Sequence, residues 1–159
     1  MNRLMISLIA VLVLLISSQL TAENSRNRVI TVEDLRSIST LSKERNLPVM
    51  MFFASDTCEF CDRLEKDYLA GMSSNSDYVD KVIIRRILID GYDDIYDFNG
   101  DKISAEDFSA NLNVSVTPTL LMLDHNGNPI AKKLVGYQSS GFFGLYLDEI
   151  IEQATQRLN

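Results

Sequence analysis

The sequence predicts an α/β fold in a single domain. Segments that are apolar at helical spacing alternate with short, continuous apolar runs of strand length, a pattern typical of strand–helix–strand units. The chain has 159 residues, of which 46% are apolar and 23% are charged, as in an average soluble domain. This composition disfavours disordered, collagen-like and multi-spanning membrane proteins.

Residues 1–22 have the pattern of a secretory signal peptide. Arg3 precedes an apolar run, and small or polar residues follow the run as far as Ala22. The run is shorter than the roughly 20 residues of a bilayer-spanning helix. We therefore expect cleavage after Ala22, with an uncleaved membrane anchor as the alternative because Leu20 is larger than the usual residue three positions before the cut. The domain then covers residues 23–159 and works outside the reducing cytosol, in a bacterial periplasm.

The first half of the domain is predicted to run helix, strand, helix. Thr31 resembles a helix N-cap, and apolar residues recur at helical spacing to about Arg45. Val49–Ala54 is a continuous apolar run that suits a central strand buried on both faces. A second helix begins at Cys58 and extends to about Met72, so the first cysteine lies where a strand leads into a helix.

The next strand is predicted at residues 82–90, which are rich in β-branched side chains. With the preceding strand and helix it forms a strand–helix–strand unit, whose strands we expect to be parallel with a right-handed crossover. Residues 91–102 form an acidic surface insertion with a small hairpin that turns at Asn99-Gly100. Ser104 then resembles the N-cap of a short helix.

The last part of the domain is predicted to be a hairpin followed by a helix. Thr119–Leu123 is a strand, residues 124–129 are dense in turn-forming residues, and residues 130–135 return as the second arm. A closing helix spans about 140–158.

The charge of the chain argues against a nucleic-acid partner. The sequence holds 22 acidic and 15 basic residues, for a net charge of −7, and it has no basic stripe. Nucleic acid is therefore not expected as a partner. Because the apolar run before Ala22 is too short to span a bilayer, we also expect no stable insertion into a membrane after signal cleavage.

Cys58 and Cys61 form a C-x-x-C motif that contains every cysteine of the chain. A structural disulfide is one interpretation, yet closing so short a loop removes only about 2 kcal/mol of unfolded-state entropy. A zinc or iron–sulfur site needs about four ligands, and the chain adds only the distant His125. Covalent haem attachment requires a histidine directly after the second cysteine, where Asp62 stands.

Thiol–disulfide exchange is the remaining interpretation. Unpaired backbone N–H groups and the positive end of the dipole at a helix N-terminus stabilise a Cys58 thiolate, and Cys61 lies nearly one turn further on, within reach of the Cys58 sulfur. Cys58 is then the attacking cysteine and Cys61 the resolving cysteine. Glu59 beside the nucleophile opposes thiolate formation, so we expect Cys58 to be less acidic than in strongly oxidising relatives.

The sequence resembles the thioredoxin superfamily, and specifically the periplasmic thioredoxin-related proteins of the SoxW type. A C-x-x-C motif followed about 55 to 60 residues later by Thr-Pro and a hairpin is a specific combination. The matching segments are the apolar strand leading into the C-x-x-C motif, the insertion at 97–100, the run Val116–Thr119, the hairpin turn around Gly127, and Gly136-Tyr137.

The resemblance implies a thioredoxin-like fold with a central mixed sheet of four to five strands flanked by helices. It also implies dithiol–disulfide exchange with protein substrates by Cys58 and Cys61, and a cis peptide bond at Thr117-Pro118 that faces the cysteines. We expect the rigid turn at Pro118 to leave the Thr117 backbone free to pair with an extended substrate segment. Phe60 is interpreted as part of a substrate-facing patch.

Two positions depart from cytoplasmic thioredoxins. Phe52 stands where these proteins carry a buried acid that helps to deprotonate the second cysteine, and Thr57 replaces the tryptophan that usually precedes the first. Proton transfer from Cys61 therefore needs another acceptor, for which Asp56 and a water molecule are candidates.

We expect a periplasmic thiol–disulfide oxidoreductase that uses no cofactor and no metal, and that acts as a reductant fed by a membrane electron donor. The main alternative is a redox-silent binding module of the same fold, whose disulfide is static. A copper-handling chaperone that uses both thiolates is a weaker alternative, because no cluster of histidines or methionines surrounds Cys58 in the sequence.

Overall fold

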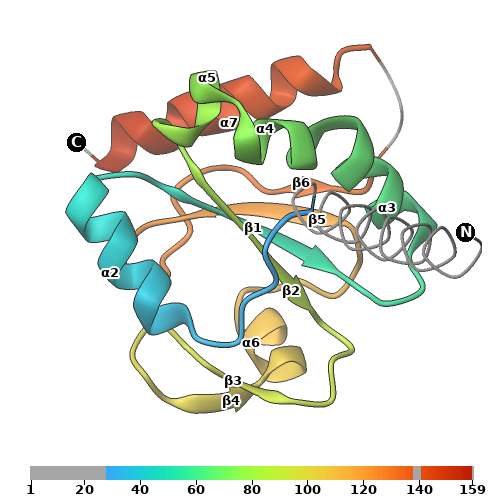
Figure 1. Cartoon of the computed structure of the whole chain (residues 1–159). Coiled ribbons are helices and arrows are strands. Elements are labelled where there is room, and N and C mark those ends of the chain that lie inside the picture. The colour runs from blue at the N-terminus through green and yellow to red at the C-terminus, as the bar shows by residue number, and fades with distance from the viewer. Residues whose placement is uncertain (1–27, 138–140, 159) are drawn as a thin grey trace, which may run out of the picture.

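The computed structural model describes residues 28–137 and 141–158 (Figure 1). It contains a four-stranded sheet with helices on both faces and a separate two-stranded hairpin, which confirms the predicted α/β class. The predicted signal peptide lies outside the described residues. The elements are, in chain order, α2 (Leu35–Arg45), β1 (Val49–Ala54), α3 (Glu59–Leu64), η1 (Glu65–Leu69), α4 (Ala70–Ser74), α5 (Ser76–Val79), β2 (Ile83–Leu88), β3 (Asp94–Tyr96), β4 (Lys102–Ser104), α6 (Ala105–Asn111), β5 (Thr119–Leu123), β6 (Leu134–Val135) and α7 (Phe143–Leu158).

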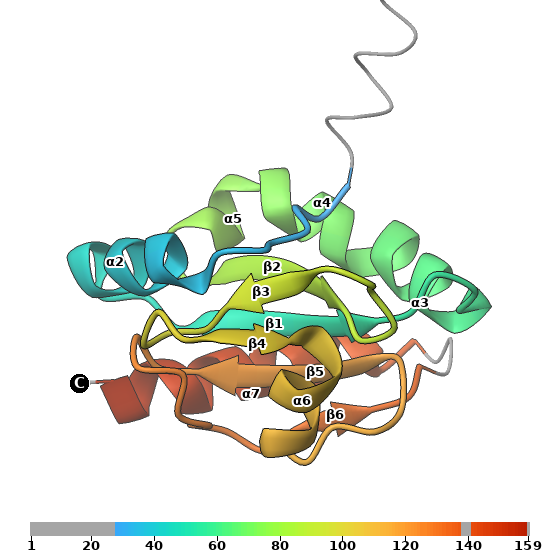
Figure 2. The ribbon, with the colours of Figure 1, turned by 90° about the horizontal axis from the view of Figure 1, so that it is seen from below.

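The four strands of the main sheet lie in the order β2-β1-β5-β6. Figure 2 shows the β3–β4 hairpin and α6 in front of this sheet and α7 behind it. Strands β1 and β2 are parallel, whereas β5 is antiparallel to both β1 and β6. The sheet is therefore mixed, and the parallel pairing predicted for the strand–helix–strand unit is confirmed.

Strand β1 lies between two apolar cores, and all six of its residues are buried. Met50 and Phe52 pack into the core on the side of α3 and α7, while Met51 and Phe53 pack into the core on the side of α2 and α6. A strand that is covered on both faces needs a continuous apolar sequence. Burial of each such side chain contributes about 1.5–3 kcal/mol. The end of β1, from which the chain continues to Cys58, is therefore held firmly.

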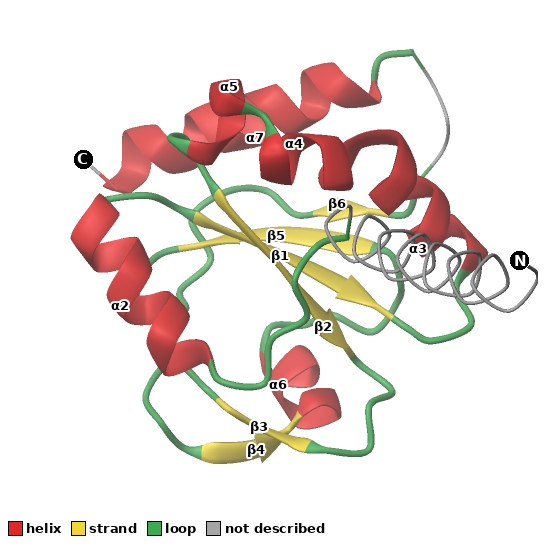
Figure 3. Cartoon of the chain, in the orientation of Figure 1, coloured by secondary structure: helices red, strands yellow, loops and turns green. Residues whose placement is uncertain are grey.

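One continuous helix follows β1 and is divided into the segments α3, η1 and α4 (Figure 3). Segment η1 is a π-helical turn, in which the Ala70 N–H donates to the Glu65 carbonyl. The residues that join the segments keep a right-handed helical backbone, so the helix is not interrupted. The predicted helix from Cys58 to about Met72 is confirmed in its extent, but the π turn within it was not predicted. Such turns shift the register of a helix and are frequent at functional sites.

A short segment before α2 pairs with the free edge of β2. The Val32 N–H donates to the Arg86 carbonyl at 2.9 Å, and Thr31 forms a parallel bridge with Arg86. The prediction that Thr31 caps the first helix is therefore wrong. Asp34 caps α2 instead, by accepting a hydrogen bond from the Arg36 N–H at 2.9 Å. Pairing with the edge of β2 gives the backbone N–H of Val32 and the carbonyl of Ile30 hydrogen-bond partners within the protein.

A buried ion pair ties this segment to η1. Among the described residues, Glu65 is the charged residue with a buried side chain. Its Oε2 accepts a hydrogen bond from Arg86 Nη1 at 2.9 Å. Its Oε1 accepts a second hydrogen bond from the Val29 N–H at 2.7 Å. Arg86 Nε donates in turn to Thr31 Oγ1 at 2.8 Å. The start of η1 is thereby attached to both β2 and the segment that pairs with it.

The acidic insertion folds into the β3–β4 hairpin that the sequence predicts. Asp97 Oδ1 accepts hydrogen bonds from the backbone N–H groups of Asn99 and Asp101, and Gly100 supplies the left-handed turn residue with φ of 92°. The Phe98 ring, on the loop of this hairpin, packs against Gly127 in the turn after β5.

Replacing Gly127 with alanine is expected to destabilise the fold by about 2 kcal/mol. Gly127 has a φ of 84°, which costs an L side chain about 1–2 kcal/mol. An added Cβ would also lie 2.6 Å from Phe98 Cδ2, so the ring must move. Chemical denaturation measures the loss. Gly71→Ala is the matched control, because nothing lies within 4 Å of its added Cβ. Equal stability of the two variants would contradict the packing of Phe98 on Gly127.

The end of the chain differs in length from the prediction. Strand β6 covers only Leu134–Val135, whereas the second arm was predicted at 130–135. The arm does begin in antiparallel register, because the Ile130 N–H donates to the Met122 carbonyl at 2.9 Å. The predicted start of the last helix, residue 140, lies outside the described residues, and α7 is described from Phe143. Among the described helices, none is long and apolar enough to cross a membrane.

Candidate active site

Cys58 lies where the loop after β1 enters α3, at the N-cap position of that helix. Its backbone is extended, whereas its carbonyl accepts hydrogen bonds from the N–H groups of Cys61 and Asp62 at 3.0 and 3.1 Å. The Cys58 Sγ also accepts a hydrogen bond from the Cys61 N–H at 3.1 Å. The sulfur therefore faces the positive end of the helix, as predicted, where a negative charge on it is stabilised.

Cys58 and Cys61 are joined by a disulfide, with a Cα–Cα distance of 5.2 Å. Cys58 is partly exposed, whereas Cys61 is only 3% exposed and contributes to the core between α3 and the sheet. This difference in exposure is consistent with the roles that the sequence predicts for the two cysteines. Of the two side chains, that of Cys58 is the one that solvent reaches.

The second part of the site is the loop before β5, in which the Thr117–Pro118 peptide bond is cis. Thr119 Oγ1 donates to the Val116 carbonyl at 2.8 Å, and the Gly136 N–H donates to the Pro118 carbonyl at 2.8 Å. Pro118 is buried and Thr117 is partly exposed. Of these two predicted substrate-binding residues, Thr117 is thus the one that a substrate can contact at the surface.

The two loops of the site contact each other through side chains. Ser55 Oγ lies 3.1 Å from Thr117 Oγ1, although 62 residues separate them in the chain. Ser55 is three positions before Cys58, so this hydrogen bond joins the loop that carries the reactive sulfur to the loop that carries the cis-proline. Ser55 was not singled out from the sequence, since a lone serine in a loop gives no signal until the pairing of β1 with β5 is known.

Phe60, the third predicted substrate-binding residue, lies on the outer side of α3 and is 53% exposed. The guanidinium carbon of Arg63 lies 5.8 Å from the centre of its ring. Val116, in the cis-proline loop, is 52% exposed. Helix α3 and the cis-proline loop therefore each present one apolar side chain to solvent.

The central strand β1 contains no acidic residue. Phe52, at the position where cytoplasmic thioredoxins carry a buried acid, is fully buried. The candidate proton acceptor Asp56 is exposed, and its backbone N–H donates to both carboxylate oxygens of Asp90 at 3.2 Å. Asp56 therefore lies at the surface, whereas the Cys61 side chain is buried.

Tyr137 connects the helix of the active site to the loop of the cis-proline. The Tyr137 hydroxyl donates to Asp67 Oδ2 on η1 at 2.7 Å. Tyr137 also directly follows Gly136, whose N–H donates to the Pro118 carbonyl. Its ring contacts those of Tyr68 and Phe143. Burial of the ring, together with the hydrogen bond to the Asp67 carboxylate, raises the pKa of Tyr137 to about 12.

Tyr137→Phe is expected to flatten the alkaline end of the pH–stability profile. Because the folded-state pKa of Tyr137 is raised, its contribution to stability is complete below about pH 10 and is lost as the pH rises towards about 12. Unfolding by urea at pH 8, 10 and 12 measures this dependence. The wild-type protein should lose more stability than Tyr137→Phe between pH 10 and 12. Parallel curves would show that Tyr137 does not titrate in this range.

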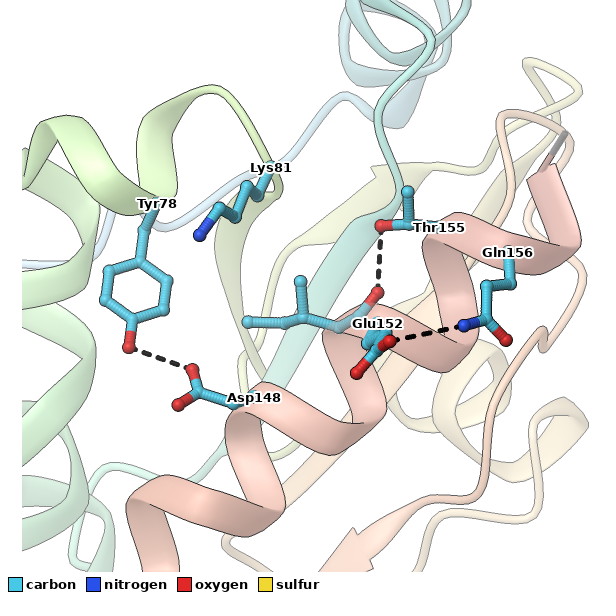
Figure 4. A pocket seen from close by; sticks show the side chains of 7 residues that line it. Tyr78, Lys81, Asp148, Glu152, Thr155 and Gln156 are labelled. Carbon is cyan, nitrogen blue, oxygen red and sulfur yellow. Dashed lines mark hydrogen bonds between the residues drawn. The ribbon is translucent and has the colours of Figure 1, made fainter.

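A hollow of about 490 Å3 lies between α5 and α7, at the far end of the helical layer from α3 (Figures 1 and 4). Tyr78 donates to Asp148 Oδ1 across it at 2.9 Å, and this hydrogen bond raises the pKa of Tyr78. The hollow contains no cysteine or histidine. Its polar contacts hold α5 against α7 and take no part in the disulfide site.

Metal binding has no geometric support in the part of the chain that the structure describes. Across residues 28–137 and 141–158, no three histidine, cysteine or acidic side chains come together as a group that could hold a metal ion. His125 lies in the turn after β5, where its carbonyl accepts a hydrogen bond from Ser39 Oγ at 2.6 Å. His125 therefore lies on a different loop from the cysteines.

The arrangement of sheet, helices and C-x-x-C disulfide defines a thiol–disulfide oxidoreductase. The profile of the thioredoxin-like domain family matches residues 37–151, which is well over half of the chain. The chain belongs to this family.

Solved structures share the fold. Thioredoxin O2 from Arabidopsis thaliana in its oxidised state is 24% identical, with a TM-score of 0.51, and the match covers 80% of this chain and 95% of that one. Thioredoxin f from spinach chloroplast (short form) is 19% identical, with a TM-score of 0.53 and coverage of 82% and 95%. Fasciola hepatica thioredoxin is 13% identical, with a TM-score of 0.54 and coverage of 79% and 99%. No curated protein matches the chain.

Proposed function

We propose that the protein reduces disulfides in other proteins outside the cytosol, as a periplasmic thioredoxin-related protein of the SoxW type. The observation that carries the proposal is the difference between the two cysteines. Cys58 is partly exposed at a helix N-terminus, and its disulfide partner Cys61 is buried beneath it. Such a pair suits attack by one thiol and release by the other.

The reaction starts from the dithiol form. The Cys58 thiolate attacks one sulfur of a substrate disulfide, so that a mixed disulfide forms and the other substrate sulfur leaves as a thiolate. Cys61 then loses its proton and attacks the Cys58 sulfur, which releases the second substrate thiolate and forms the Cys58–Cys61 disulfide. The substrate gains two electrons and the protein loses two. A dithiol donor returns the protein to its starting state by the same exchange in reverse.

The proposed substrate-binding residues are Thr117, Pro118 and Phe60. An extended substrate segment pairs with the backbone of Thr117, which forms no backbone hydrogen bond to any other described residue. Phe60 contributes apolar contact area beside the cysteines. Pro118 lies below the surface and acts by shaping the loop.

The start of the sequence supports the proposed place of action and the proposed electron donor. Residues 1–22 have the charge and apolar pattern of a secretory signal peptide. An exported protein is separated from cytosolic reductants, so we assign the donor to a membrane dithiol protein.

The test is to capture the mixed disulfide. Cys61→Ser keeps the attacking sulfur and removes the resolving one, so it should hold a reduced insulin chain on Cys58 that non-reducing electrophoresis detects. The wild-type protein with dithiothreitol should reduce insulin catalytically. Absence of turnover with the wild-type protein, together with no captured insulin, would favour the redox-silent binding module instead.

A further inference from the structure

We propose that Ser55 is a positioning residue for the substrate-binding loop, and that it acts through the hydroxyl of Thr117. This inference rests on the proposed function, because it concerns how the loop holds a substrate. Neither residue forms or breaks a disulfide. Ser55 contributes by holding Thr117 in the orientation in which its backbone faces a substrate bound at Cys58.

The register of the sheet explains why these two residues meet. Strands β1 and β5 are antiparallel, and Phe53 is paired with Thr119 at the end of the ladder. Continuing the same register by two positions places Ser55 opposite Thr117. Pro118 lies between Thr117 and Thr119 in the chain, and its carbonyl accepts a hydrogen bond from the Gly136 N–H on the β6 side. No backbone hydrogen bond joins Ser55 to Thr117. The 3.1 Å contact between the two hydroxyls extends the pairing with side chains instead.

The rest of the loop is held at other points. The Thr119 hydroxyl binds the Val116 carbonyl, and the Gly136 N–H binds the Pro118 carbonyl. These contacts fix the loop on both sides of Thr117 but none of them reaches Thr117 itself. Among the described residues, the contact with Ser55 is the hydrogen bond that restrains Thr117.

The consequence for the reaction is a division between substrate binding and sulfur chemistry. Without the Ser55 hydroxyl, Thr117 is free to adopt other rotamers, and a substrate must order it on binding. The Michaelis constant for a protein substrate should then rise. The sulfur chemistry at Cys58 should not change, because Ser55 touches neither sulfur.

The experiment compares two substrates. Reduction of fluorescently labelled insulin, with dithiothreitol in excess, depends on backbone pairing. Reaction with 5,5′-dithiobis(2-nitrobenzoic acid) does not, because this small disulfide has no peptide backbone. For Ser55→Ala we expect the KM for insulin to rise about fivefold, as for the loss of one neutral hydrogen bond, with kcat and the small-disulfide rate within about twofold of wild type.

Three further variants make the result specific. Ser55→Thr keeps a hydroxyl and should restore most of the wild-type KM. Thr117→Val should raise KM to the same extent, and the double variant Ser55→Ala/Thr117→Val should add nothing further, because one hydrogen bond is lost in each case. Ser74→Ala, on the exposed end of α4, is the matched control and should behave as wild type.

The outcomes separate this inference from the function on which it rests. An unchanged KM in Ser55→Ala, additive effects in the double variant, or an equal loss with the small disulfide would each overturn the inference while leaving the oxidoreductase activity in place. If the wild-type protein does not reduce insulin at all, the proposed function fails and this inference fails with it.

Discussion

Replacement of Cys58 by serine is expected to lower kcat/KM for insulin reduction at least about a thousandfold, because a serine hydroxyl does not attack sulfur at neutral pH. Cys61 remains in this variant but is only 3% exposed, so it should not take over the attack on a protein substrate. The rate is measured by insulin reduction with dithiothreitol, after subtraction of the uncatalysed reaction.

Cys61→Ser is the matched comparison, since both variants lose the disulfide and any stability it provides. Its turnover should also be lost, but its single attack on substrate should survive at close to the wild-type rate in stopped-flow measurements. If Cys58→Ser retained appreciable turnover while Cys61→Ser did not attack, the roles assigned from the exposure of the two cysteines would be reversed.

Replacement of Glu65 by alanine is expected to destabilise the fold by about 3 kcal/mol. The side chain of Arg86, which is 17% exposed, would then lack its carboxylate partner, and the Val29 N–H would lose its acceptor. Chemical denaturation at neutral pH measures the loss. Glu44→Ala, at an exposed position on α2, is the control and should change stability by less than about 0.5 kcal/mol.

A second variant separates the charge from the packing. Glu65→Met combined with Arg86→Met removes both charges and keeps apolar volume, so it should recover much of the stability lost by Glu65→Ala. A loss below about 1 kcal/mol in Glu65→Ala would show that the ion pair contributes little and that the segment before α2 is held by its pairing with β2 alone.

Elements with a strong local pattern were predicted correctly from the sequence. The six apolar residues of β1 suit only a strand covered on both faces, and the order of β1, helix and β2 predicted their parallel pairing. Ser104 was predicted as a cap and does accept a hydrogen bond from the Asp107 N–H. The burial of β1 and the cap at Ser104 follow from patterns within a few residues, whereas the parallel pairing follows from the order of the elements along the chain.

Thr31 shows where local pattern misleads. A threonine followed by acidic residues resembles a helix cap, but the same residue pairs with β2 in the folded protein. The partner, Arg86, is 55 residues away in the sequence, so nothing near Thr31 indicates the pairing. Glu65, where the π turn begins, is a similar case, because its partners Val29 and Arg86 lie 36 and 21 residues away in the sequence.

The chemistry of the site was apparent in the cysteine pattern, whereas its geometry was not. Two cysteines at C-x-x-C spacing before a helix are enough to predict which sulfur attacks, because the helix N-terminus acts on the nearest residue. That Cys58 is reachable and Cys61 is buried depends on how α3 packs on the sheet.

Local sequence is thus sufficient for the fold class, the central strand and the C-x-x-C pair, since propensity, capping and apolar periodicity act over one or two helical turns, whereas the cis peptide bond at Pro118 was expected from the family resemblance. The contacts of Ser55 with Thr117, of Glu65 with Arg86 and of Tyr137 with Asp67 are decided by the folded chain. Each joins residues between 21 and 70 positions apart. They exist only because strand register and helix packing bring those positions together, and hydrogen bonds act over about 3 Å.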